Sequence, residues 1–222
     1  MIRPLASLAP LLLFVAGCGG APADAPTAAN DARVAAKMAA PQPQADIVRV
    51  RLDTDLGPIV LALDARHAPV TTANFLAYVD QGRFDGITFY RAARTRGVAG
   101  QGFIQGGIRR DVIRMLMPIA HEPTSRTGLS HGDGIISMAR TDPGTATGDF
   151  FITAGPQPSM DAGHGRPADN LGYAAFGRVV EGRDVVRRIL AVPTDPNAGR
   201  GVMRGQMIAR PVRIVSARRA PS

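Results

Sequence analysis

The sequence contains no tryptophan, a single cysteine and a single lysine in 222 residues, and only 5% of its residues are aromatic. One cysteine cannot form a disulfide within the chain, so the fold must depend on its apolar core. The four histidines have no helical histidine partner and no neighbouring cysteine, which is unlike the ligand spacing of zinc sites. We therefore expect no metal site.

The charge that the chain does carry is mostly arginine, with a formal net charge of +8 and a pI near 11. Such values are typical of nucleic-acid-binding proteins. However, no segment forms a continuous basic stripe, and aromatic residues are not interleaved as in single-strand binders. We expect no nucleic-acid partner. One arginine cluster is expected to be a solvated face, with acidic partners or anionic lipid as alternative ligands. The cluster comprises Arg91, Arg94, Arg96, Arg109, Arg110 and Arg114.

The N-terminus has the pattern of an export signal. Arg3 precedes an apolar run over Leu5–Phe14 that is too short to span a bilayer, so a cleaved signal peptide over residues 1–17 is expected. The run ends in Val-Ala-Gly-Cys, which is similar to the lipobox of bacterial lipoproteins, whose cysteine is diacylated and becomes the mature N-terminus. We expect Cys18 to be lipidated. The alternative is an ordinary signal peptide followed by an unmodified cysteine.

The expected lipid anchor indicates where the protein works. Two or more acyl chains hold a protein stably on a membrane, and Gly19-Gly20 is unlike an inner-membrane retention signal. We therefore expect a periplasm-facing protein, anchored to the outer membrane rather than the inner one. Residues 18–45 are rich in Ala and Pro and lack periodicity, which predicts an unstructured tether. Residues 46–222 (222 − 45 = 177 residues) suffice for one domain, expected to be monomeric.

The apolar pattern of this domain is mainly that of short strands. Apolar residues alternate with arginines over Val48–Leu52, which predicts a half-buried strand. A helix is predicted over 69–81, with Pro69 at its start and Gly82 after its end, and a second around 185–190. The remaining predicted strands cover residues 59–63, 87–91, 103–106, 135–139, 150–153, 173–180 and 212–215. Many short strands with two helices favour a closed sheet.

Five sequence blocks indicate which kind of closed-sheet protein this is. They are FYR, FIQGG, GIISMAR, GDFFI and LGYAAFGRVVEG, in this order between residues 89 and 182. Over about Asp46 to Ser216 the chain resembles the cyclophilin family of peptidyl-prolyl cis-trans isomerases. The resemblance implies a closed eight-stranded antiparallel β-barrel capped by two α-helices. It also implies an enzyme that accelerates rotation about X-Pro bonds without a cofactor, acting on proline-containing unfolded or flexible polypeptides.

The resemblance also assigns roles within these blocks. Arg91 matches the family's catalytic arginine, which donates to the prolyl nitrogen once amide resonance is broken. Gln105 matches the glutamine beside it, and Phe151 matches the phenylalanine that floors the proline pocket. The other implied substrate-binding residues are Phe103, Ala139, Arg140, Asp149, Met160 and Tyr173.

Three departures from the family pattern bear on activity. Residues 92–102 are longer than the usual link before Gln105, which indicates an insertion beside the site. Asp149 stands where a glutamine is usual, and we expect it to pair with Arg91 and compete with substrate. Ser159 replaces an aromatic residue, often tryptophan, on which cyclosporin recognition in the family depends. The leading hypothesis is an isomerase for envelope proteins, and the alternative is a weakly active or non-catalytic module that binds proline peptides.

A rival motif points to a different enzyme class. Gly128–Gly132 fits G-x-S-x-G, the nucleophile elbow of serine hydrolases, with Asp161 and His164 downstream. An elbow requires a strand before the serine and a helix after it. The sequence around Ser130 predicts the opposite, because a polar segment precedes it and a β-like run follows. We therefore do not expect a hydrolase.

Overall fold

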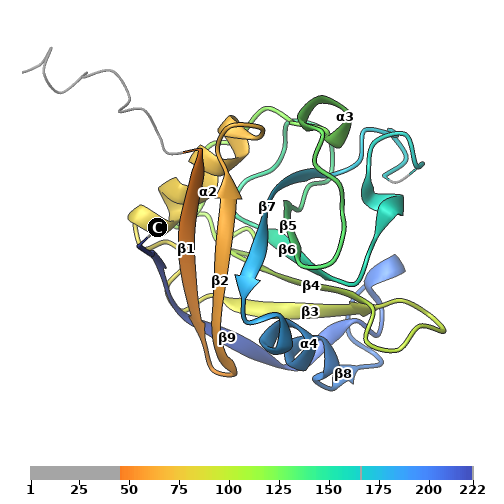
Figure 1. Ribbon diagram of the computed structural model, residues 1–222. Coiled ribbons are helices and arrows are strands. Elements are labelled where there is room, and N and C mark those ends of the chain that lie inside the picture. Colours follow the sequence, from red (N-terminus) through yellow and green to blue (C-terminus); the bar gives the residue numbers. More distant parts are fainter. Residues whose placement is uncertain (1–45, 166, 222) are drawn as a thin grey trace, which may run out of the picture. The chain divides into compact units, whose positions relative to one another are not determined.

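The computed structural model describes residues 46–165 and 167–221, which form one sheet and its covering helices (Figure 1). The expected signal peptide, the lipidation of Cys18 and the tether lie outside the described residues. Within this part of the chain no helix is both long and apolar enough to cross a membrane.

The sheet closes on itself as an eight-stranded antiparallel barrel, which confirms the predicted fold class. Its strands are β1 (Ile47–Thr54), β2 (Gly57–Asp64), β3 (Thr88–Arg94), β4 (Gly102–Gly107), β5 (Ile135–Met138), β6 (Phe150–Ala154), β7 (Ala174–Glu181) and β9 (Met207–Arg219). The order around the barrel is β1-β2-β7-β5-β6-β4-β3-β9, and β9 pairs with β1 to close it. The two-residue β8 (Thr194–Asp195) extends the edge of β9.

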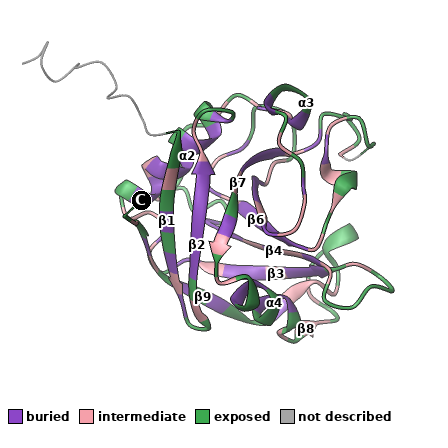
Figure 2. Cartoon of the chain, in the orientation of Figure 1, coloured by how far each residue is buried: buried purple, intermediate pink, exposed green. Residues whose placement is uncertain are grey.

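The barrel interior is apolar because side chains alternate between the two faces of each strand. Val50 and Leu52 in β1 are fully buried, whereas Arg49 and Arg51 between them are exposed. Strand β2 is buried along most of its length (Figure 2). Aromatic rings fill the centre at centroid distances of 4.9 to 5.8 Å, in tilted or edge-on pairs. These rings belong to Phe75, Phe84, Phe89, Phe150 and Phe176.

Three α-helices accompany the barrel in the described part of the chain, so the prediction of two was short by one. Helix α2 (Pro69–Asp80) and helix α4 (Arg183–Ala191) lie toward opposite ends of the barrel in Figure 1 and match the predicted segments. The third, α3 (Thr124–Thr127), has four residues and is too short to produce an apolar period. Two 3₁₀ turns complete the fold, η1 (Pro158–Met160) and η2 (Gly201–Met203).

The long link between Arg91 and Gln105 forms regular structure. Ala92, Ala93 and Arg94 continue β3 and pair with the first residues of β4, so most of the extra length prolongs this hairpin. Its tip is fixed at both sides: Arg94 donates to the carbonyl of Leu190 at 2.9 Å, and Gln101 donates to the carbonyl of Pro156 at 2.6 Å. The insertion therefore contacts the segment before η1.

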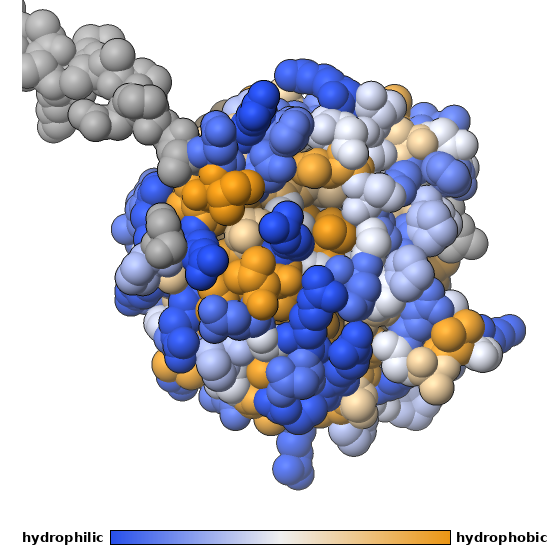
Figure 3. Space-filling model, viewed as in Figure 1, coloured by the Kyte–Doolittle hydropathy of each residue, from blue (hydrophilic) through white to orange (hydrophobic). Residues whose placement is uncertain are grey.

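The outer surface is mixed in character. On the face shown in Figure 3, apolar residues lie in small groups between hydrophilic ones. Ten ion pairs connect described residues, and all but two of them use arginine as the cation. Most of these pairs are exposed, and exposed pairs contribute on the order of 0 to 1 kcal/mol each to folding stability.

Candidate active site

A β-bulge in β3 places two neighbouring side chains on the same outer face. Phe89 pairs with Gly106 and Arg91 with Gln105, which leaves Tyr90 as the extra residue between them. Phe89 points into the core and is fully buried, and the core residue Ala92 resumes the alternation beyond the bulge. Without the extra residue Arg91 would point inward, so the bulge is what brings its guanidinium to the surface.

Arg91 is held between two neutral carboxamides. Its Nη1 donates to Oε1 of Gln105 at 2.9 Å, and its Nε and Nη2 donate to Oε1 of Gln206 at 2.9 and 2.7 Å. The guanidinium carbon lies 4.9 Å from the centre of the Phe103 ring. Burial lowers the pKa of Arg91, but an arginine remains protonated at physiological pH. Among the described residues, no carboxylate forms an ion pair with it.

Gln206 was not among the site residues predicted from the sequence. This residue precedes β9 and reaches Arg91 across 115 positions of the chain. Its own Nε2 donates to the carbonyl of Val202 at 2.8 Å, which directs Oε1 toward the guanidinium. The only sequence signal is a glutamine beside a predicted final strand, and nothing in its surroundings points to β3.

Asp149 does not pair with Arg91, so the expectation that it competes with substrate was wrong. Its Oδ1 accepts from the hydroxyl of Tyr90 at 3.0 Å and from the backbone N–H of Arg109 at 3.1 Å. Tyr90 in turn accepts from Nε2 of Gln105 at 2.8 Å. Burial raises the pKa of Asp149 and, together with the nearby carboxylate, that of Tyr90. A single chain of hydrogen bonds thus runs from Asp149 through Tyr90 and Gln105 to Arg91.

Aromatic rings form an apolar floor beside the guanidinium. The ring of Phe151, which is 3% exposed, lies 5.4 Å from Phe103 and 5.3 Å from Tyr173, edge-on to the latter. Met160 is connected to this group because its carbonyl accepts from the N–H of Tyr173 at 2.9 Å. Phe103 contacts both Arg91 and Phe151, so one ring serves the charged and the apolar part of the site. The structure therefore brings these residues, predicted from separate motifs, together.

A buried polar cluster supports the floor from behind. The imidazole of His131 stacks against Phe151 at 5.8 Å, with 15° between the ring planes. Its Nδ1 bonds Oδ1 of Asp161 at 2.5 Å, and its Nε2 bonds the hydroxyl of Ser137 at 3.0 Å. Burial lowers the pKa of His131. The neutral ring is therefore fixed by a bond at each nitrogen and fixes Phe151 in turn.

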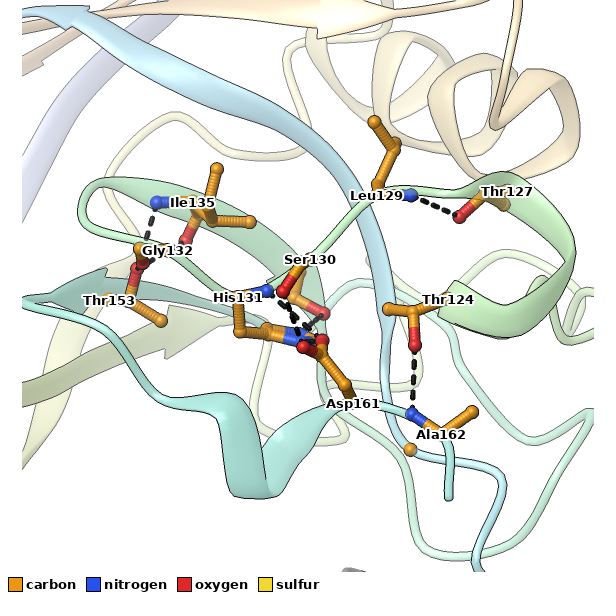
Figure 4. Close-up of polar contacts among 12 residues, drawn as sticks. Thr124, Thr127, Leu129, Ser130, His131, Gly132, Ile135, Thr153, Asp161 and Ala162 are labelled. Carbon is orange, nitrogen blue, oxygen red and sulfur yellow. Dashed lines mark hydrogen bonds and ion pairs between the residues drawn. The ribbon is translucent and has the colours of Figure 1, made fainter. Parts of the chain in front are cut away.

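This cluster also decides against the hydrolase. Figure 4 shows Ser130 and His131 both directed at the carboxylate of Asp161, and the Ser130 hydroxyl donates to Oδ2 at 2.5 Å. Ser130 follows α3 and precedes β5, the reverse of an elbow. The serine that does face the imidazole is Ser137, which is fully buried and out of reach of any substrate.

In the segment after β5, hydrogen bonds hold the side chain of Arg140, whereas part of the backbone remains without a partner among the described residues. The guanidinium of Arg140 donates to both carboxylate oxygens of Asp169 and to the carbonyl of Gly172, and lies 5.6 Å from the ring of Tyr173. This pairing lowers the pKa of Asp169 to about 2. Ala139 donates its N–H to the carbonyl of Asp149 at 2.9 Å. Within the described part of the chain, the Ala139 carbonyl and the Arg140 N–H have no partner, which suits an extended peptide.

Comparison with known proteins supports one family. A family model described as "Cyclophilin type peptidyl-prolyl cis-trans isomerase/CLD" matches residues 49–219. The chain is 39% identical over 151 residues to the peptidyl-prolyl cis-trans isomerase cyp18 of Streptomyces antibioticus, covering 68% of this chain and 87% of that protein. Identity to the peptidyl-prolyl cis-trans isomerase A of Dickeya dadantii is 37% over 147 residues, covering 66% and 73%. A solved cyclophilin-type isomerase of Cryptosporidium parvum shares the fold, with a TM-score of 0.62 at 21% identity, covering 79% and 99%.

Proposed function

Because the chain belongs to the cyclophilin family of peptidyl-prolyl cis-trans isomerases, we propose that Arg91 is the residue that accelerates rotation about the X-Pro bond. One observation carries this proposal: two neutral carboxamides bind the guanidinium of Arg91, which lies at the edge of an aromatic floor. Each of these elements has a part in the chemistry of bond rotation.

The reaction is a rotation in which no covalent bond forms or breaks. Amide resonance opposes it with a barrier of roughly 18–20 kcal/mol, and uncatalysed exchange takes tens of seconds or more. An enzyme must therefore favour the twisted amide over both planar forms. In the twisted amide the prolyl nitrogen regains its lone pair, so a positioned cation that donates there lowers the barrier selectively.

Arg91 retains the donors that this step requires. A guanidinium has five N–H groups, and three of them go to Gln105 and Gln206. One N–H on each terminal nitrogen therefore remains for substrate. Because both partners are neutral, they orient the group without compensating its charge, and electrostatic stabilisation by a preoriented group is strongest in a site of this kind.

The aromatic floor holds the other side of the rotating bond. The ring centroids of Phe103 and Tyr173 lie 5.4 and 5.3 Å from that of Phe151, and the three rings offer an apolar surface for a proline ring. The free backbone groups after β5 fix the residue before the proline, as the edge of an added strand would. With both ends held, the carbonyl between them is the part that turns.

Exchange spectroscopy on a short X-Pro peptide tests this proposal with the full-length chain. The expected result is catalysed cis-trans exchange at substoichiometric protein, with peptide signals that shift on binding. Binding without any acceleration would contradict the role of Arg91 and favour the alternative, a module that binds proline peptides and holds them.

We further propose that the isomerase is exported and acts on envelope proteins. The support lies in the N-terminal sequence, where a short apolar run ends in Val-Ala-Gly-Cys before an Ala- and Pro-rich segment. A lipidated Cys18 and a long tether place the enzyme near a membrane surface, where secreted chains fold. Replacing Cys18 with Ser should leave the protein unprocessed or release it from the membrane fraction. A Cys18→Ser protein that fractionates and migrates like the wild type would refute the lipid anchor.

A further inference from the structure

A cavity of about 400 Å³ lies on the outer surface beside the catalytic hydrogen-bond chain. Its lining includes Tyr90 and Arg109, together with Ala198, Gly199 and Arg200 from the loop between β8 and η2. The apolar residues of its lining are Ala198, Met207, Ile208 and Pro211. The cavity is therefore apolar at one part of its surface and basic at another.

The cavity shares its walls with the proposed active site. Met207 lies opposite Arg91 in the pairing of β3 with β9, and the register then jumps so that Phe89 faces Val212. The residues looped out by this jump include Ile208, which is 4% exposed and lines the cavity. Tyr90 separates the cavity from Gln105, to which its hydroxyl is bonded. A ligand in the cavity would thus be connected to the guanidinium of Arg91 through two hydrogen-bonded side chains, those of Tyr90 and Gln105.

The two arginines at the cavity have no carboxylate partner among the described residues. The backbone of Arg109 is held with φ 50° while its N–H donates to Asp149, and its guanidinium lies 5.0 Å from the centre of the Tyr90 ring. Asp149 is the acid in contact with this wall, and its Oδ1 is already bonded to Tyr90. Arg200, in the loop between β8 and η2, is the second arginine that lines the cavity. Two arginines therefore line the cavity, and neither forms an ion pair with a described residue.

We propose that this cavity is a specificity subsite that receives the side chain of an aspartate or glutamate near the proline of the substrate polypeptide. A guanidinium recognises a carboxylate through paired, charge-assisted hydrogen bonds, and the apolar part accommodates the methylene stem. An extended chain advances about 3.3 Å per residue, so the subsite serves a residue within about three positions of the proline. The inference rests on the proposed function, because it assumes that the proline is bound beside Arg91.

A peptide series with the full-length chain tests the subsite. Each peptide carries one X-Pro bond, with a single glutamate placed in turn at the three positions on either side of it, and each has a glutamine counterpart. Catalysed exchange and peptide binding are measured together by NMR at low and high salt. We expect one glutamate position to raise kcat/KM about tenfold over its glutamine counterpart, the effect of one charge-assisted hydrogen bond. The gain should shrink at high salt.

The variants separate this subsite from general attraction. Arg109→Gln and Arg200→Gln should each reduce the glutamate preference and together abolish it. For Arg200→Gln, which lies outside the hydrogen-bond chain to Arg91, turnover of the glutamine peptides should stay close to that of the wild type. Arg110→Gln is the matched control, because Arg110 is also exposed with a positive φ of 63° but does not line the cavity. It should leave the preference intact.

Two outcomes would overturn the subsite. One is equal kcat/KM and equal binding for every glutamate and glutamine pair. The other is a preference that Arg110→Gln removes as readily as the double variant does, which would mean long-range attraction by the arginine cluster. If no peptide is turned over at all, the proposed function fails, whereas a glutamate preference in binding alone still supports the subsite.

Discussion

The two halves of the site, the aromatic floor and the surroundings of Arg91, differ in whether their polar groups are fully hydrogen-bonded. Behind the aromatic floor, His131 is bonded at both ring nitrogens and is 1% exposed, so its polar groups are satisfied out of reach of solvent. At the polar edge, Arg91 is only partly buried and keeps two N–H groups free. The aromatic floor is therefore a fixed surface, whereas the guanidinium of Arg91 keeps free hydrogen-bond donors at the place where the X-Pro bond is proposed to rotate. Binding and catalysis can therefore be changed separately.

The largest expected effect comes from removing the charge at the edge. Arg91→Ala should lower the catalysed exchange rate by about 100-fold or more, equivalent to about 2.7 kcal/mol of barrier, because the guanidinium acts chiefly on the twisted amide. Peptide affinity should change only modestly. Exchange NMR on a proline peptide measures both quantities. Equal losses of rate and affinity would instead mean that Arg91 binds all states uniformly.

A gain of binding is expected at the floor. Ser159 lies exposed in η1 beside Met160, where the family usually has an aromatic residue. The wild type should therefore bind cyclosporin weakly, and Ser159→Trp should strengthen binding by about thirtyfold, since a buried aromatic contact is worth about 2 kcal/mol. Calorimetric titration of both proteins provides the comparison. Tight binding by the wild type would show that another side chain fills this position.

Gln206 allows a sharper test of the surroundings of Arg91, because the proposal depends on the partners of Arg91 being uncharged. Gln206→Glu keeps the shape but gives Arg91 an anionic partner, and should lower kcat about tenfold, or about 1.4 kcal/mol of barrier. Gln206→Ala should lower kcat less, because it removes the orienting bond without compensating the charge. If Gln206 had only a structural role, glutamate would be the milder substitution. That ranking would refute the argument from neutral partners.

The smallest expected effect is on stability and belongs to the floor. Burial lowers the pKa of His131 below its value of about 6.5 in an unfolded chain. The unfolded state then binds more protons as the pH falls below about 6.5, so the free energy of unfolding should decrease there, by at most about 1.4 kcal/mol per pH unit. Urea unfolding of wild type and His131→Gln between pH 5 and 8 should show a flatter profile for the variant.

A second histidine provides the control for that measurement. The pKa of His121 is also lowered by burial, but its ring bonds the carbonyl of Leu171 and lies outside the cluster beneath Phe151. His121→Gln should therefore reduce the pH dependence without changing peptide turnover. If His131→Gln left the pH dependence of the free energy of unfolding unchanged, the His131 side chain of the wild type would have to bind protons equally in the folded and unfolded states.

The features that the sequence predicted correctly are local and periodic. Alternation and turn residues located all eight barrel strands. The structure also brings together Arg91, Gln105 and Phe151, which were predicted from separate motifs, because Arg91 bonds Gln105 and Gln105 pairs with Phe151 across β4 and β6. The final strand was predicted only over 212–215, whereas β9 begins at Met207. Pro211 and the register jump beside it interrupt the alternation, so the first part of this strand has no period to detect.

Contacts between distant segments could not be predicted in the same way. Gln206 reaches Arg91 from 115 residues away, and the choice of Tyr90 rather than Arg91 as the partner of Asp149 depends on one bulged residue. Each is set by register, which follows from how the barrel closes rather than from local preference. The expected pairing of Asp149 with Arg91 was wrong for this reason.

The start of helix α2 shows what such a distant contact implies for folding. Its first residues have no side-chain cap of their own, and the carboxylate of Glu122 accepts instead from the N–H groups of Val70 and Thr71 and from the Thr71 hydroxyl. Glu122 is 1% exposed and lies 51 residues after Thr71, beyond β3 and β4. The first turn of α2 is thus completed only when the segment that follows the active-site hairpin has folded back onto it. We expect this turn to form late in folding, after the hairpin that carries Arg91 and Gln105.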